Sequence, residues 1–234
     1  MSPKVPEGGA KPRMLVLTST YPRWRDDPEP GFVHELARRL TADFQVMVLA
    51  PHARDAAVEE ELDGVLVCRY RYAPAAWETL VNDGGMVANL RGNPLKWLLV
   101  PGFLLSQAWV TRRLSRQYRP DVIHAHWLIP QGLVVTLIRL FGQIPPFLVT
   151  SHGADIYSLR GSVLNALKRR VARSAAAMSV VSSAMQDEAA RIGLRPPRLE
   201  VLPMGVDFQG RFAPDAAQPR GTDELLFEIG RAHV

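Results

Sequence analysis

Cysteine is almost absent from this chain of 234 residues, because Cys68 is the only one. A lone cysteine cannot close an intramolecular disulfide, so the sequence excludes a disulfide-stapled scaffold and favours a reducing, cytoplasmic location. Cys68 lies inside the strand-like run 65–70, where a small buried hydrophobe is the usual role of this residue type. Catalysis by this thiol is therefore not expected.

Several sequence signatures of nucleotide and acyl chemistry are also missing. The chain has no G-x-G-x-x-G and no G-x-x-x-x-G-K-[ST], which disfavours a dinucleotide-dependent oxidoreductase and a Walker-type nucleotidase. It has no G-x-S-x-G elbow, and neighbours along one loop rarely reach triad geometry, which argues against a hydrolase built on Ser151, His152 and Asp155. His124 and His126 have a spacing that permits metal ligands, but further ligands are not evident nearby, so no metal is expected.

Long apolar runs are lacking too. The stretches 97–111 and 122–138 are interrupted by proline, glycine or histidine and fall short of the roughly 18 to 20 apolar residues of a spanning helix. Residues 1–12 are polar and rich in proline and glycine, unlike a secretory signal. We predict that they form a disordered lead-in.

Acidic residues are absent from two long intervals, although the net charge of the whole chain is only +5. The interval between Asp83 and Asp121 and the one between Asp155 and Asp187 contain only basic charges. Solvated helix faces would explain them, and so would an anionic partner such as lipid headgroups or a phosphorylated substrate. No nucleic-acid partner is expected. The basic residues are Arg91, Lys96, Arg112, Arg113, Arg116 and Arg119 in the first interval, and Arg160, Lys168, Arg169, Arg170 and Arg173 in the second.

Short apolar runs alternate with segments of helical periodicity along most of the chain. This order predicts an α/β fold, a Rossmann-like doubly wound parallel sheet, with the first strand at its centre. The expected strands are 14–19, 45–50, 65–70, 121–127, 147–149, 177–181 and 199–202. The expected helices are 31–40, 94–118 with a kink at Pro101, 129–141, 162–173 and 183–192.

The candidate site residues follow the ends of these strands. Ligands of open α/β sheets bind beyond the carboxyl ends of the strands, where His126, Trp127, His152 and Gly153 fall. Gly31, at the start of the first helix, would let a phosphate approach the free N–H groups there. We therefore expect His152 and Gly31 to share one edge of the sheet. The alternative for His152 is an ordinary loop histidine that is hydrogen-bonded to a neighbour. The alternative for Gly31 is a turn that merely needs a small residue.

The domain boundaries follow from composition. Residues 13–207 are predicted to form one domain, and 208–227 to form a linker and the first strand of a second domain. Residues 228–234 read EIGRAHV, which matches the translation of a common sequencing adapter, so we expect this tail to be non-native.

Six motifs in a fixed order resemble the amino-terminal half of family 4 retaining glycosyltransferases. These enzymes have the GT-B architecture, in which two Rossmann-like domains face a cleft. The resemblance extends over residues 13–227. The motifs are STYPR (19–23), PGFVHELARRL (30–40), DVIHAHW (121–127), TSHGADIY (150–157), VVSSAM (180–185) and VLPMGVD (201–207).

The resemblance implies that a longer parent enzyme transfers a sugar from a UDP- or GDP-linked donor to a glycan or lipid-linked acceptor. It implies polysaccharide or cell-envelope biosynthesis without a metal or cofactor. The basic stretches would hold such an enzyme in peripheral contact with an anionic inner membrane face. A sugar-nucleotide epimerase of the same architecture and a noncatalytic binding module are the alternatives. Because the donor-binding half is not present, we expect the chain alone to be inactive.

The resemblance also implies site roles. His152 would be catalytic, and His126, Trp127 and Asp155 would bind substrate. The glycines assigned to binding of the nucleotide-sugar co-substrate are Gly31, near the donor diphosphate, Gly153, beside the imidazole, and Gly205, in the segment that leads into the second domain.

Overall fold

The computed structural model describes residues 11–205, except 26, 28, 30 and 83. The predictions for 1–10, for the linker and strand at 208–227 and for the tail at 228–234 lie outside the described residues. Lys11 and Pro12, which the sequence placed in the lead-in, are already bonded to the domain. The Lys11 ammonium donates to the Thr41 carbonyl at 2.9 Å, and the Gln45 N–H donates to the Pro12 carbonyl at 2.9 Å.

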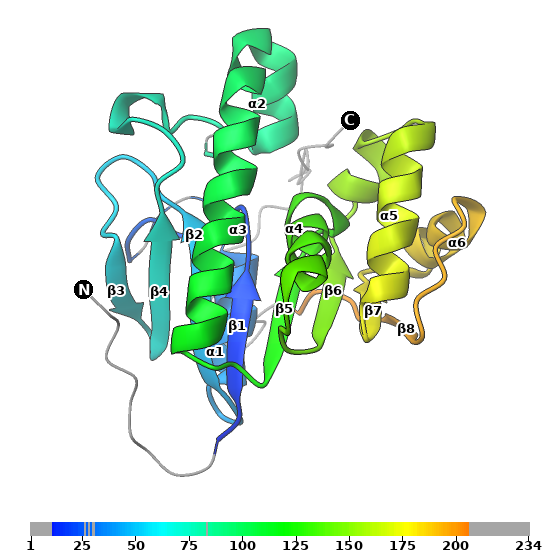
Figure 1. Ribbon diagram of the computed structural model, residues 1–234, viewed down its shortest axis with the longest axis horizontal. Helices are drawn as coiled ribbons and strands as arrows, with labels where there is room; N and C mark the ends of the chain where they lie inside the picture. Colours follow the sequence, from blue (N-terminus) through cyan, green and yellow to red (C-terminus); the bar gives the residue numbers. More distant parts are fainter. Residues whose placement is uncertain (1–10, 26, 28, 30, 83, 206–234) are drawn as a thin grey trace, which may run out of the picture.

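An eight-stranded sheet forms the centre of the domain, in the order β3-β4-β2-β1-β5-β6-β7-β8 (Figure 1). Neighbouring strands pair in parallel except β3, which is antiparallel to β4. The prediction of a doubly wound sheet is confirmed, and the sheet is mixed rather than purely parallel. The strands are β1 (Arg13–Leu17), β2 (Gln45–Pro51), β3 (Glu59–Leu62), β4 (Val65–Tyr70), β5 (Val122–His126), β6 (Phe147–Ser151), β7 (Ala177–Val180) and β8 (Leu199–Val201).

The strand β3 escaped the sequence analysis because its residues, EEEL, lack a hydrophobic pattern. Its turn is nevertheless visible in the sequence. Asp63 and Gly64 join β3 to β4 with φ values of 49° and 79°. An Asp-Gly pair with both φ angles positive is the preferred two-residue hairpin turn.

Helices cover both faces of the sheet, with α3, α4 and α5 on the near face in Figure 1 and α1 behind it. No helix in the described residues is long and apolar enough to cross a bilayer. The helices are α1 (Phe32–Leu40), α2 (Met86–Gly92), α3 (Leu99–Gln117), α4 (Leu133–Ile138), α5 (Ser162–Ser174) and α6 (Ser183–Arg191). Short helical turns are η1 (Ala75–Trp77), η2 (Pro94–Leu98), η3 (Leu128–Gly132), η4 (Arg139–Phe141) and η5 (Ala154–Ser158).

The two faces of the sheet follow from the alternation of side chains along β1. Met14 and Val16 belong to the core that includes Val33 of α1. Leu15 and Leu17 point to the other face and belong to the larger core under α3, α4 and α5. Burial of both sets explains why β1 reads as one continuous apolar run.

The helix α3 begins later than the sequence suggested. Residues 94–98 form the separate turn η2, and Pro101 lies in the first turn of α3, where its missing N–H would have no helical partner. Next to it, Gly102 lies against the segment that follows β4: a Cβ added there would come within 2.6 Å of the Tyr72 carbonyl oxygen. The close approach of α3 to the sheet therefore requires a glycine at this position.

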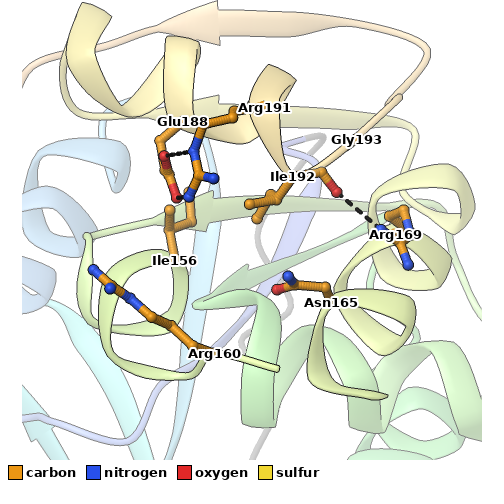
Figure 2. A pocket seen from close by; sticks show the side chains of 8 residues that line it. All are labelled: Ile156, Arg160, Asn165, Arg169, Glu188, Arg191, Ile192 and Gly193. Atoms are coloured by element: carbon orange, nitrogen blue, oxygen red, sulfur yellow. Dashed lines mark hydrogen bonds and ion pairs between the residues drawn. The ribbon is translucent and has the colours of Figure 1, made fainter. Parts of the chain in front are cut away.

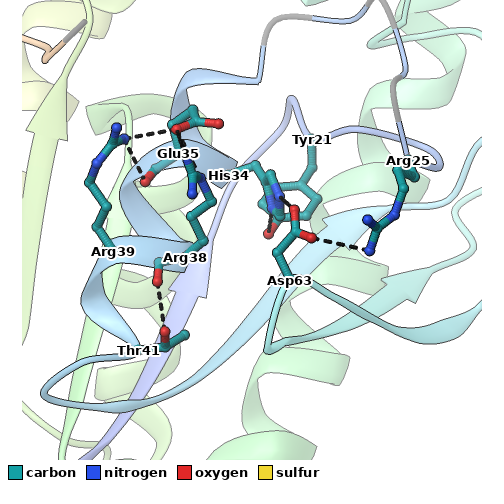
Figure 3. Close-up of polar contacts among 8 residues, drawn as sticks. All are labelled: Tyr21, Arg25, His34, Glu35, Arg38, Arg39, Thr41 and Asp63. Carbon is teal, nitrogen blue, oxygen red and sulfur yellow. Dashed lines mark hydrogen bonds and ion pairs between the residues drawn. The ribbon is translucent and has the colours of Figure 1, made fainter. Parts of the chain in front are cut away.

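A chain of polar contacts holds α1 against the turn between β3 and β4 (Figure 3). The Tyr21 hydroxyl lies 2.8 Å from His34 Nδ1, and His34 Nε2 lies 2.9 Å from Asp63 Oδ2. Arg25 pairs with the same carboxylate at 3.2 Å. The hydrogen bond from His34, followed in weight by the charge of Arg25, lowers the pKa of Asp63. These contacts fix the orientation of the helix that Gly31 precedes.

Candidate active site

The sheet reverses its winding direction between β1 and β5. From β1 the chain passes through α1 to β2 on one side, whereas β5 lies on the other side of β1. At such a switch point the connections diverge to opposite faces and leave a crevice beyond the carboxyl ends of the strands. The start of α1 and the ends of β5 and β6 meet there.

Three histidine rings are stacked at this edge. His124 and His126 lie on the same face of β5, as their spacing predicted, with ring centroids 4.2 Å apart. The ring of His152, just after β6, is stacked on His126 at 5.1 Å with an interplanar angle of 13°. His126 Nδ1 and His152 Nε2 are 2.8 Å apart, so the two rings are also hydrogen-bonded.

Two aromatic side chains complete the surroundings of His152. The Phe32 ring lies 4.8 Å from the imidazole and the Trp127 ring lies 5.1 Å from it. Phe32 is the first residue of α1 and follows Gly31, so His152 and Gly31 lie at the same edge of the sheet. The expectation that these two positions share an edge is confirmed.

Burial keeps this histidine cluster uncharged. It lowers the pKa of His124 to about 3 and that of His152 to about 4, and it lowers the pKa of His126 well below the ordinary value of 6.5. At neutral pH all three rings are therefore neutral, and they cannot supply positive charge to a phosphate. They can donate or accept hydrogen bonds.

Two hydroxyl groups continue the hydrogen bonds of the cluster across the sheet. His124 Nε2 lies 2.8 Å from the Thr150 hydroxyl, which lies 2.7 Å from the Ser179 hydroxyl on β7. Each group belongs to a neighbouring parallel strand. The cluster is thus held by the register of β5, β6 and β7.

Asp155 lies inside the wall of the site instead of on its surface. Its side chain is buried, with one oxygen accepting from the Leu128 N–H at 2.7 Å and the other from the Ser151 hydroxyl at 2.6 Å. Burial raises the pKa of this carboxyl. The carboxylate therefore ties the turn after β5 to the end of β6, and Ser151 is engaged with Asp155 while His152 bonds to His126. The hydrolase triad considered from the sequence does not form.

The three predicted glycines differ in whether their backbone conformation requires a glycine. Gly153 has φ +107°, a conformation that L side chains rarely adopt. Gly31 has φ −86°, and a Cβ there would lie 3.9 Å from Pro22, so neither the backbone nor packing requires glycine. Gly205 is exposed after β8, at the end of the described residues, with nothing within 4 Å of a Cβ position. The described contacts do not bring Gly205 to the histidines.

A separate hollow of about 330 Å³ lies between α5 and α6 (Figure 2). Three of its cations are already bonded within the protein: Arg191 to Glu188 at 2.6 Å, Arg169 to the Ile192 carbonyl at 3.2 Å, and Arg160 to the Tyr157 carbonyl at 2.7 Å. The histidine cluster does not line it. Its lining is Ile156, Arg160, Asn165, Arg169, Glu188, Arg191, Ile192 and Gly193.

Sequence reasoning missed Phe32 and Thr150 as parts of the site. Phe32 falls inside the expected helix 31–40 as an ordinary apolar residue, although its place directly after Gly31, at a helix start, was a usable signal. Thr150 directly follows the apolar run 147–149, two residues before His152, a pattern too common to single out. Among the described residues, no group of three or more His, Cys, Asp or Glu side chains is arranged to hold a metal ion.

The doubly wound sheet, with polar and aromatic side chains gathered at its switch point, places this chain in the class of Rossmann-like α/β domains. The model of glycosyltransferase family 4 matches residues 32–209, and the chain belongs to that family.

Relatives with known names are also glycosyltransferases. TuaC of Bacillus subtilis, named as a teichuronic acid biosynthesis glycosyltransferase, is 31% identical over 211 residues, which cover 85% of this chain and 51% of TuaC. The glycogen synthase of Mycobacterium tuberculosis is 28% identical over 239 residues, which cover 94% of this chain and 54% of that protein. The chain therefore spans about half the length of these relatives.

Solved structures show the same fold at low identity. Sucrose-phosphate synthase from Thermosynechococcus elongatus aligns with a TM-score of 0.60 at 14% identity, covering 84% of this chain and 49% of that one. The N-terminal domain of trehalose-6-phosphate phosphatase from Candida albicans aligns with a TM-score of 0.52 at 12% identity, covering 88% of this chain and 51% of that one.

Proposed function

We propose that this chain is the acceptor-side half of a retaining glycosyltransferase. The whole enzyme would transfer a sugar from a UDP- or GDP-linked donor to a glycan or lipid-linked acceptor, using no metal and no cofactor. Family membership and the glycosyltransferase relatives support the reaction class. The share of those relatives that the chain covers supports the assignment to one half.

One observation carries the assignment of the site: His152 lies at the switch point between the aromatic rings of Phe32 and Trp127. Apolar and aromatic surfaces with a few convergent polar groups are typical of small-ligand sites, and aromatic faces pack well against sugar rings. We assign His152 as the catalytic residue that contacts the sugar and the acceptor.

The hydrogen bond to His126 decides which nitrogen of His152 faces the ligand. Nε2 of His152 is bound to His126, which leaves Nδ1 for a substrate hydroxyl. Nε2 of His126 is buried without a partner among the described residues. A buried N–H without a partner is rarer than a bare acceptor, so His126 would carry its proton on Nδ1 and donate it to His152. His152 would then present Nδ1–H to the substrate as a donor.

The remaining residues would position substrates around this group. Gly31, which carries no side chain at the start of α1, would let the donor diphosphate approach the N–H groups of the helix. Gly153 would leave room beside the imidazole, and Gly205 would act where the chain leads toward the donor half. Trp127 would line the acceptor side. Asp155 would act indirectly, by holding the loops of Leu128 and Ser151.

Sugar transfer needs positive charge around the departing diphosphate, and preorganised charge and positioning each lower such barriers by several kcal/mol. The neutral histidines cannot provide that charge. It would come from the other half of the enzyme, so the chain alone would be inactive. Polysaccharide or cell-envelope assembly at the cytoplasmic face is the setting we propose, supported by the name of TuaC and by the unpaired Cys68.

The test is an assay of the complete open reading frame beside the 234-residue chain, each offered a panel of UDP- and GDP-sugars with glycan and lipid-linked acceptors. We expect transfer by the complete enzyme and none by the chain. Transfer by the chain alone would refute the assignment to one half. Interconversion of the nucleotide sugar without transfer would favour the epimerase alternative.

A further inference from the structure

The outer surface formed by α3 and α4 combines exposed apolar side chains with arginines. We call it the α3–α4 face. Leu98, which caps the start of α3, and Leu105 and Trp109 on the helix are exposed and are followed by the arginines. Steps of seven, four, three and four residues keep all of these on one side of the helix. The face consists of Leu98, Leu105, Trp109, Leu137, Leu140 and Phe141, with Arg112, Arg113, Arg116 and Arg139.

The contribution of α4 and η4 is contiguous with that of α3. An Arg112 guanidinium N–H donates to the Phe141 carbonyl at 2.7 Å, which joins the end of η4 to α3. Leu137, Leu140 and Phe141 share one side of their helical turns, and all three are exposed, Phe141 by 74%. Figure 1 shows α3 and α4 next to one another on the near face of the sheet.

The helices that form this face contain no acidic residues. No Asp or Glu occurs between Asp83 and Asp121, or between Asp121 and Asp155, and these intervals contain all of α3, α4 and η4. Asp155 itself is buried. The arginines of the face are therefore not neutralised by carboxylates of their own helices.

We propose that the α3–α4 face docks on the surface of an anionic lipid bilayer. An exposed apolar stripe with tryptophan, bordered by arginines, is the composition of helices that lie in the membrane interface. The apolar side chains enter the headgroup boundary and the guanidinium groups bind lipid phosphates. A second copy of the chain is disfavoured as the occupant, because a self-complementary contact would bring the arginines of the two copies together.

The direction of α3 relates this surface to the candidate site. The helix precedes β5 and runs antiparallel to it, so its first residues lie at the carboxyl edge of the sheet, where the histidines are (Figure 1). Leu98 and the neighbouring exposed Trp97 are at that end. A lipid-linked acceptor anchored in the same bilayer could thus reach the cleft. This inference rests on the proposed function, because the lipid-linked acceptor is part of that proposal.

The experiment is co-sedimentation of the 234-residue chain with vesicles of phosphatidylcholine, with and without 30% phosphatidylglycerol. We expect binding to the anionic vesicles that is at least tenfold stronger than to the neutral ones and that weakens in 0.5 M salt. Trp109→Ser should reduce this binding several-fold. Trp77→Ser is the matched control, because Trp77 is equally exposed, 63% against 64%, and lies outside the face.

A second pair of variants tests the arginines. Arg116→Gln should weaken binding to anionic vesicles about fivefold, the effect expected of one arginine at the surface. Arg173→Gln, in the exposed last turn of α5, should leave it unchanged. Thermal unfolding verifies that all four variants fold.

Three results would overturn the inference: no binding to anionic vesicles, equal binding to both kinds of vesicle, or equal losses in the face variants and their controls. The assay contains no donor and no acceptor. Vesicle binding by a protein whose complete form transfers no sugar would refute the proposed function alone. Transfer without vesicle binding would refute this inference alone.

Discussion

His126 and His152, from neighbouring strands, are stacked and hydrogen-bonded to one another, with 2.8 Å between Nδ1 and Nε2. Because each ring is neutral at pH 7, the two rings interact through a hydrogen bond between uncharged groups. This hydrogen bond fixes the orientation of the His152 ring and leaves its Nδ1 for a ligand.

Acid should destabilise the domain through these histidines. Their native pKa values are depressed below the unfolded value of about 6.5, so the unfolded chain takes up protons first. The stability they contribute is complete above pH 6.5 and is lost as the pH falls toward 4, by up to about 1.4 kcal/mol per pH unit for each histidine.

Urea unfolding between pH 7 and 4.5 measures this slope. His124→Asn should reduce it by up to about 1.4 kcal/mol per pH unit, because it removes one of the three groups, whereas Ser179→Ala keeps all three and should keep the slope. The raised pKa of buried Asp155 increases stability as the pH falls, opposite to the histidines, and it does so equally in the wild type and in both variants. An unchanged slope in His124→Asn would contradict the assigned neutrality of that ring.

Asp155 should be worth more to the fold than its single charge suggests. Asp155→Ala leaves the Leu128 N–H and the Ser151 hydroxyl without their partner, and we expect a loss of about 2–4 kcal/mol in the free energy of unfolding. Asp155→Asn keeps one acceptor and should cost less. Asp187→Ala, on the exposed side of α6, should stay within about 0.5 kcal/mol. Equal costs at positions 155 and 187 would refute the bridging role.

Gly102 should not accept a methyl group. A Cβ would lie 2.6 Å from the Tyr72 carbonyl oxygen, and backbone cannot move aside cheaply, so Gly102→Ala should cost about 1–3 kcal/mol or more. Gly92→Ala is the matched helical control, because nothing lies within 4 Å of its Cβ position. It should be neutral or slightly stabilising. Thermal unfolding of the two variants decides the matter, and similar melting temperatures would be evidence against close packing of α3.

The contact between Tyr21 and His34 should help to hold α1. Tyr21→Phe removes the hydroxyl that lies 2.8 Å from His34 Nδ1 and should lower the free energy of unfolding by about 1 kcal/mol. The same change at the half-exposed Tyr157 should have little effect. Hydrogen exchange of the α1 amides should also rise in Tyr21→Phe. If α1 were equally protected in both variants, the role of this contact in fixing the helix would be excluded.

The order of strands and helices was predictable because buried parallel strands are short apolar runs and the amphipathic helices carry a clear period. The edge strand β3 was not predictable, because a half-exposed strand of glutamates has neither an apolar run nor a hydrophobic period. The edge shared by Gly31 and His152 was also predictable from topology.

Contacts across the sheet could not be predicted from the sequence. The bond between His126 and His152 depends on the register of β5 and β6, and the inward direction of Asp155 depends on a turn that periodicity does not encode. Lys168 was counted among the solvated charges of α5. It is fully buried, and its ammonium donates to the Leu159 carbonyl.

The most direct measurement is the rate of sugar transfer by the complete enzyme carrying His152→Ala, compared with the wild type and with Arg173→Gln. The account predicts a loss of about a hundredfold or more in His152→Ala, the scale of a removed general acid–base or polar catalytic group, with no loss in the control. Wild-type transfer by a folded His152→Ala enzyme would contradict it.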